Sequence, residues 1–105
     1  MGECTVDVDP GVCKLKTTVK AVLTDDGSVL ISGESDCPNV TKLIEALGPL
    51  SPWNEVALPL CETTVYKTAN TCIPHAACPV PCAMMKALEV ASELAIKHDV
   101  CLRIH

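Results

Sequence analysis

The sequence contains almost no aromatic side chains. Phenylalanine is absent, and Trp53 and Tyr66 are the single tryptophan and the single tyrosine. Hydrophobic residues still make up 49% of the 105 positions, so the core must be built from Val, Leu, Ile, Ala and Cys. Such a core favours a compact two-layer structure and argues against a broad aromatic-lined pocket.

Three further absences narrow the class of protein. No apolar stretch approaches the ~18 residues needed to cross a bilayer, and the polar, acidic start of the chain has no features of a signal peptide. The formal net charge is -5 with Lys and Arg scattered, whereas phosphate-backbone binding needs clustered positive charge. We therefore expect a soluble, cytoplasmic, single-domain protein over residues 1–105 that binds neither membranes nor nucleic acid. The sequence identifies no protein partner and leaves a homo-oligomer open.

Cysteine is the informative residue that is present. Without an export signal, we expect a reducing compartment and free thiols or metal ligands rather than structural disulfides. Each thiol is then a buried small apolar residue, a metal ligand or a reactive group. The eight cysteines are Cys4, Cys13, Cys37, Cys61, Cys72, Cys78, Cys82 and Cys101.

Alternating apolar and polar residues predict strands over 4–8, 14–23, 28–34 and 99–104. The sequence Asp25-Asp26-Gly27 predicts a tight hairpin between the second and third of them, because Asp-Gly tolerates positive φ. Two stretches have helical spacing. One begins at Pro38 and ends at Gly48, and the longer one runs from about Pro79–Pro81 to about Lys97.

Between these two helices the sequence predicts a helical turn near Trp53–Val56 and a short helix over 63–70. The predicted fold is therefore α+β. It is a two-layer sandwich with a mostly antiparallel sheet of about four strands and two main helices on one face.

Two cysteines share one local context. Cys37 in Ser35-Asp36-Cys37-Pro38 precedes the first main helix, and Cys78 in Cys78-Pro79-Val80-Pro81 precedes the last. Unpaired N–H groups point outward at a helix N-terminus and favour the thiolate over the thiol. We therefore predict lowered pKa values for both thiols.

Pairing geometry predicts that a third thiol lies close to Cys37. In the hairpin, residues whose numbers sum to about 51–53 face each other, which places Cys13 at the edge where Cys37 begins the helix. Cys78 joins them if both helices start at the same end of the fold. His75, in the spacing Cys72-x2-His75-x2-Cys78, or Cys61 would supply a fourth ligand for zinc or an iron–sulfur cluster.

Two other hypotheses stay open beside metal binding. In the first, Cys78 is the nucleophile of a thiol or persulfide sulfur carrier or of a redox protein. In the second, the chain is a structural or interaction domain, Cys13 and Cys37 are ordinary buried residues, and His75 is an ordinary loop histidine. We find no Ser/His/Asp arrangement and no phosphate-binding glycine loop, so an enzyme is not favoured.

Three segments together resemble a family of proteins: Asp9-Pro10-Gly11-Val12-Cys13, Ser35-Asp36-Cys37-Pro38, and His75-Ala76-Ala77-Cys78-Pro79-Val80-Pro81 followed by Lys86-Ala87-Leu88. The family is a small cysteine-containing one of methanogenic archaea and anaerobic bacteria, catalogued as a domain of unknown function, and the resemblance spans nearly the whole chain. It implies an anaerobic cytoplasmic setting and a shared set of Cys13, Cys37, His75 and Cys78, but no activity.

Cys78-Pro79-Val80-Pro81 is also similar to the Cys-Pro-x-Pro helix start of TusA-like sulfur carriers, although here the motif stands late in the chain. The Ser35-Asp36-Cys37-Pro38 segment is similar to a later segment of those proteins, so the order is reversed. This second resemblance implies persulfide transfer through Cys78.

Overall fold

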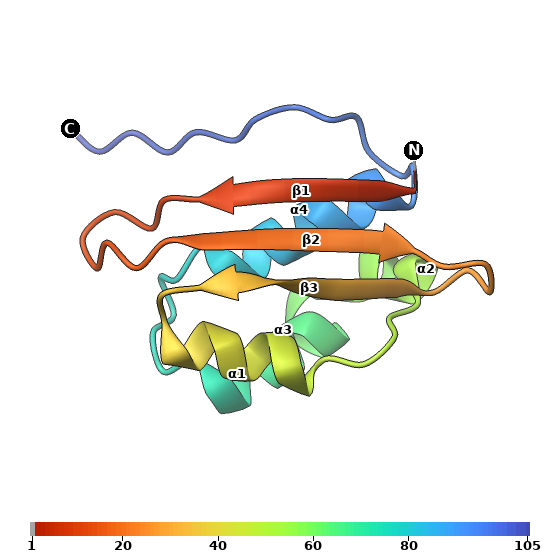
Figure 1. The fold of residues 1–105 in the computed structure, drawn as a ribbon, viewed down its shortest axis with the longest axis horizontal. Helices are drawn as coiled ribbons and strands as arrows, with labels where there is room; N and C mark the ends of the chain where they lie inside the picture. The colour runs from red at the N-terminus through yellow and green to blue at the C-terminus, as the bar shows by residue number, and fades with distance from the viewer. Residues whose placement is uncertain (1) are drawn as a thin grey trace.

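The computed structural model describes residues 2–105. Three strands near the start of the chain form an antiparallel sheet (Figure 1). The strand order is β1-β2-β3, and Thr17 pairs with Ser35 and Leu23 with Val29, as the hairpin register predicts. Gly27 has a φ of +87° in the connecting turn. The strands are β1 (Glu3–Val8), β2 (Thr17–Leu23) and β3 (Val29–Ser35).

The helices form a second layer on one face of this sheet (Figure 1). The longest, α4, packs across β1 and β2, whereas α1 packs against β3. The α+β class and the two-layer arrangement are confirmed, with four α-helices where two main ones are predicted. They are α1 (Pro38–Ala46), α2 (Pro52–Ala57), α3 (Thr64–Cys72) and α4 (Val80–Ala91), with a 3-10 turn, η1 (Leu60–Glu62), before α3.

The core lies between the sheet and α4. Met84 and Leu88 of α4 are fully buried, as are Val19 of β2 and Val29 of β3. These aliphatic side chains fill the interior where larger proteins often place aromatic rings, while Trp53 is 70% exposed. The core is therefore aliphatic, as the composition predicts.

One glycine allows β2 and β3 to approach closely. Gly33 pairs with Val19 and has a φ of +147°. A Cβ atom at this position would lie 2.0 Å from the carbonyl oxygen of Thr18 and 3.2 Å from the Cα of Val19. Only a residue without a side chain fits this backbone.

Several predicted element boundaries are wrong. The strand predicted over 14–23 starts only at Thr17, because Lys14 has a φ of +60° in a turn closed on Gly11. The last helix ends at Ala91 instead of about Lys97. There the Ser92 hydroxyl donates to the Leu88 carbonyl at 2.6 Å and Glu93 adopts a φ of +63°. These local interactions compete with further helical hydrogen bonds.

The first helix also ends differently from the prediction. Leu47 is its last capping residue, with an extended backbone, and its N–H donates to the Leu43 carbonyl. Gly48 does not have a positive φ, so it is not the left-handed terminator that the sequence suggests.

The fourth strand predicted over 99–104 is not formed. These residues have no regular secondary structure and are exposed. Figure 1 shows them as an extended segment that follows the direction of β1. A strand pattern needs a hydrogen-bonding partner to become a strand, and β1 pairs only with β2 among residues 2–105. Within the same range, no helix combines the length and apolar character that a membrane span requires.

Candidate functional site

All eight cysteines are free thiols, and they fall into three environments. Cys4 is buried in the core on β1. Cys37, Cys72 and Cys78 are half-buried and pack against the core. The remaining four are exposed and comprise Cys13, Cys61, Cys82 and Cys101.

Cys37 is held in place by a short polar network at the start of α1. Its backbone N–H donates to the Ser35 hydroxyl at 3.0 Å, and this hydroxyl lies 2.7 Å from that of the buried Thr17. Cys37 itself occupies the N-cap position of α1, and Pro38 follows it in the first turn. The Ser35-Asp36-Cys37-Pro38 sequence therefore builds a fixed turn that joins the end of β3 to the helix.

Cys78 lies in the turn just before α4. Its N–H donates to the His75 carbonyl at 3.1 Å, which closes the loop between α3 and α4. Burial raises the pKa of the Cys78 thiol, and the backbone N–H of Val80 at the helix start opposes this effect only in part. The prediction of a lowered pKa is therefore wrong for Cys78, because loss of solvation outweighs the helix terminus.

Two further cysteines act on Cys78 through their charges. The thiolates of Cys37 and Cys13 also raise the pKa of Cys78. Figure 1 shows that α1 and α4 both begin at the end of the sheet where β2 begins. We call Cys13, Cys37 and Cys78 the thiol cluster.

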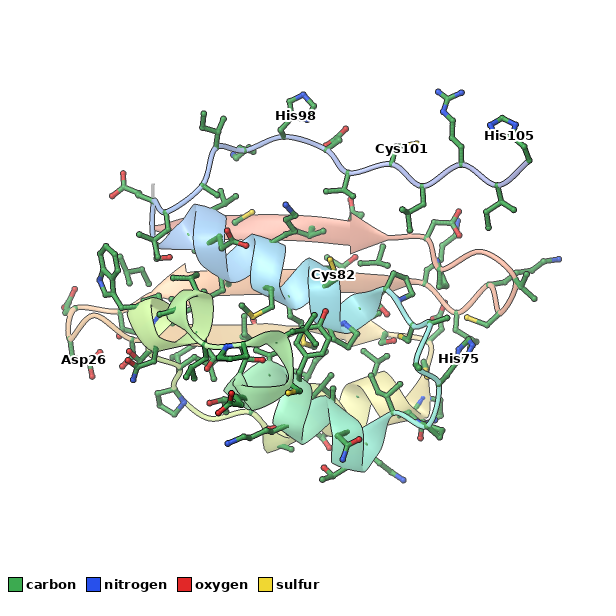
Figure 2. The ribbon with its side chains drawn as sticks, turned by 180° about the vertical axis from the view of Figure 1, so that it is seen from behind. Asp26, His75, Cys82, His98, Cys101 and His105 are labelled. Carbon is green, nitrogen blue, oxygen red and sulfur yellow. The ribbon has the colours of Figure 1, made fainter. Side chains whose placement is uncertain are left out.

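The candidate fourth ligands differ in position. His75 is exposed, and Figure 2 places it at the same end of the molecule as the loop between β1 and β2. Cys61 lies in η1, before the nine-residue helix α3, whereas Cys72 ends that helix. The half-buried Cys72 is therefore nearer to Cys78 in sequence than Cys61 is. The short spacing Cys72-x5-Cys78 is the sequence feature that indicates Cys72 as a further candidate ligand.

The thiol cluster is not a preformed metal cage. Among residues 2–105, no three His, Cys, Asp or Glu side chains are arranged so that they could hold a metal ion. Cys13 is exposed in the turn between β1 and β2. It lies beyond the last residue pair of strands β2 and β3, which is Thr17 with Ser35. The two half-buried thiols are thus fixed by helix starts, and the third is on a surface turn.

A shallow hollow of about 290 Å³ lies elsewhere, between α2, η1 and the exposed side of α4. Tyr66 and Cys82 line it, and burial together with the Cys82 charge raises the pKa of Tyr66. Figure 2 shows Cys82 on α4, away from His75. This hollow contains none of the residues of the thiol cluster.

One acid that sequence patterns do not single out is structurally important. Glu55 of α2 is 2% exposed, and its two carboxylate oxygens accept the N–H groups of Thr64 and Val65 at 2.9 and 3.0 Å. The carboxylate thereby caps the N-terminus of α3, nine residues further on. A lone Glu in an irregular stretch carries no local pattern for such a role.

The raised pKa of Cys78 predicts how its reactivity depends on pH. We expect iodoacetamide to modify Cys78 more slowly than the exposed Cys101 at neutral pH, and the rate at Cys78 to rise with a midpoint above that of a peptide thiol. Peptide mass spectrometry after timed quenching measures both rates. Equal rates at the two thiols would contradict the expectation.

The same shift predicts the pH dependence of stability. Because the folded pKa of Cys78 lies above its unfolded value, the thiol contributes stability that is present at neutral pH and lost as pH rises through the folded pKa. The free energy of unfolding should therefore fall less steeply above neutral pH in Cys78→Ser than in the original chain. Urea unfolding at several pH values measures this difference.

The structure is thus a small α+β domain with an antiparallel three-stranded sheet and eight free cysteines. Comparison with family models identifies the chain: residues 4–104 match DUF6951, a family of unknown function, and the protein belongs to this family. The resemblance to an uncharacterised family is thereby confirmed. No curated protein and no solved structure matches the chain.

Proposed function

We propose that the protein binds a soft transition-metal ion, of which zinc is the best probe, through the thiolates of Cys13, Cys37 and Cys78. His75 or Cys61, or Cys72 at the end of α3, would complete the ligand set, because four N or S ligands satisfy a tetrahedral zinc ion. The same thiolates would serve an iron–sulfur cluster.

The electrostatic environment of Cys78 supports this proposal best. Burial raises the pKa of this thiol, and the charges of Cys37 and Cys13 raise it further, so negative charge on the Cys78 sulfur costs free energy in the protein alone. A bound divalent cation removes this cost and deprotonates the thiols. A nucleophile for neutral pH would need the opposite shift, a lowered pKa.

The local structure fixes two of the three thiols and leaves the third on a surface turn. Cys37 is fixed by Ser35 and Thr17, and Cys78 by its hydrogen bond to His75 and its contact with the core. Cys13 is on an exposed turn in which Gly11 and Lys14 have positive φ. A fixed pair of thiols with a third on a surface turn allows metal to enter without a change in the core.

The test is titration of the fully reduced chain with Co²⁺ and Zn²⁺ under anaerobic conditions. We expect thiolate-to-cobalt charge-transfer absorption that zinc displaces, and release of protons on binding. Cys37→Ser and Cys78→Ser should each weaken zinc binding by at least about 100-fold. Cys82→Ser and Cys101→Ser are matched controls on exposed cysteines and should bind as the original chain does.

Two results would overturn the proposal. One is the absence of charge-transfer absorption in the original chain after complete reduction. The other is equal zinc affinity in Cys37→Ser, Cys78→Ser and both controls, since the ion would then be held by other residues.

A second candidate function is persulfide transport on Cys78. The Val80 N–H at the start of α4 stabilises negative charge on the Cys78 sulfur, and it would do the same for a persulfide. In that reaction the Cys78 thiolate attacks the outer sulfur of a donor persulfide, a new S–S bond forms, and the donor thiolate leaves. A mass increase of one sulfur atom on Cys78, absent in Cys78→Ser, would support it, and slow alkylation of Cys78 at neutral pH counts against it.

A further inference from the structure

The strand β1 forms an open edge of the sheet. Among residues 2–105 it pairs only with β2, so the N–H and C=O groups along its other side have no strand partner. Val6 and Val8, which share the core-facing side of β1 with the buried Cys4, are only half-buried. An open edge next to an incompletely covered core is a template for another strand.

The segment 95–104 ends in a strand pattern over 99–104 that has no partner among the described residues. Val100, Leu102 and Ile104 alternate with more polar residues and are 61%, 83% and 98% exposed. No backbone hydrogen bond joins this segment to another strand in the part of the chain that the structure describes. Exposed apolar residues in such a row mark a surface that gains free energy by being covered.

The two elements are complementary in charge. β1 carries Glu3 and Asp7 on its exposed side and no basic residue, with Lys20 of β2 lying 4.0 Å from Glu3. The segment 95–104 carries Lys97 and Arg103 against a single acid, Asp99. Opposite charges on neighbouring strands contribute favourably, and like charges in these places would oppose pairing. Charge therefore favours contact between β1 and this segment over contact between two β1 edges.

We propose that segment 95–104 of one copy adds to β1 of a second copy as an antiparallel strand, and that the exchange is reciprocal and gives a two-fold dimer. Within one chain, α4 delivers the segment in the direction of β1 (Figures 1 and 2), so pairing with its own β1 would be parallel. A second copy is free to approach in the antiparallel direction, which gives the more stable ladder. Reciprocal exchange leaves neither β1 edge open.

One antiparallel register places the apolar side chains of the two strands opposite one another and Arg103 between two acids. It sets Val100 opposite Val8, Leu102 opposite Val6 and Ile104 opposite Cys4, all on the core side, because side chains alternate along a strand.

On the solvent side, the same register places Arg103 opposite Thr5. Its guanidinium group would then lie between Glu3 and Asp7, within reach of diagonal contacts. The half-buried Val6 and Val8 would be covered.

The first experiment measures molar mass by light scattering over a concentration range of about 100-fold, in reducing buffer. We expect a dimer whose dissociation constant rises at least about 100-fold in Leu102→Asp. Val12→Asp is the matched control, since Val12 is 99% exposed on the loop between β1 and β2. Leu102 is 83% exposed, so its replacement leaves the folded monomer intact, which far-UV circular dichroism verifies.

A charge exchange tests the register. Arg103→Glu and Asp7→Lys should each weaken the dimer, and the double variant should recover most of the lost affinity. A monomer at every concentration overturns the proposal. So does a dimer that Leu102→Asp leaves unchanged. A monomer whose amides over 99–104 resist hydrogen exchange would assign the segment to the β1 of its own chain instead.

Discussion

Replacing Gly33 by Ala should destabilise the protein by about 3 kcal/mol or more, because an added Cβ would lie 2.0 Å from the Thr18 carbonyl oxygen. That atom belongs to the backbone of the neighbouring strand, so β2 and β3 would have to separate where they pair. The φ of +147° at Gly33 adds strain for any other residue. Thermal or urea unfolding of Gly33→Ala measures the loss.

Gly48→Ala is the matched control for this prediction. Nothing lies within 4 Å of a Cβ atom at Gly48, and its φ is not positive. Alanine has fewer unfolded conformations than glycine. This variant should therefore be as stable as the original chain, or more stable by about 0.5 kcal/mol. If Gly33→Ala unfolded at the same urea concentration as Gly48→Ala, the close approach of the strands at Gly33 would be disproved.

Replacing Glu55 by Ala should lower the free energy of unfolding by about 2–4 kcal/mol. The change removes the acceptors of the Thr64 and Val65 N–H groups and leaves two donors at the start of α3 without partners. Val65 is fully buried, so water cannot easily replace the lost acceptor. Glu55→Gln should lose less, because one amide oxygen can still accept.

Glu45→Ala is the matched control for Glu55, since Glu45 is an exposed acid on α1. We expect a change within about 0.5 kcal/mol for this variant. Urea unfolding followed by circular dichroism gives both values, and hydrogen exchange at Thr64 and Val65 locates the effect. Equal stability of Glu45→Ala and Glu55→Ala would show that the capping carboxylate is not needed.

The parts of the fold that sequence patterns predict are those with a local cause. The Asp25-Asp26-Gly27 turn sets the β2–β3 register, because Gly27 can adopt a positive φ and Asp26 accepts the Ser28 N–H at 3.1 Å. The start of α1 follows from Pro38 in the same way. In both cases, the chemistry lies within a few residues of the element that it determines.

Features without a distinctive local pattern could not be predicted. The length of α4 is limited by the Ser92 hydroxyl and the turn at Glu93, but Ser and Glu also occur inside helices and do not mark a helix end. The segment 99–104 has a strand pattern whose partner is missing.

The same reason explains what sequence reasoning missed at the candidate site. The pKa of Cys78 depends on how deeply the thiol is buried, which no spacing rule records. The capping role of Glu55 joins residues on two different helices.

The position of Cys4 gives the chain a built-in reporter of its own unfolding. Cys4 is 7% exposed and lies on the core side of β1, so a thiol reagent reaches its sulfur when the sheet opens. When closing is faster than labelling, the labelling rate measures the free energy of that opening. Labelling of Cys4 thus reports whether the sheet is closed, independently of the chemistry of the exposed cysteines.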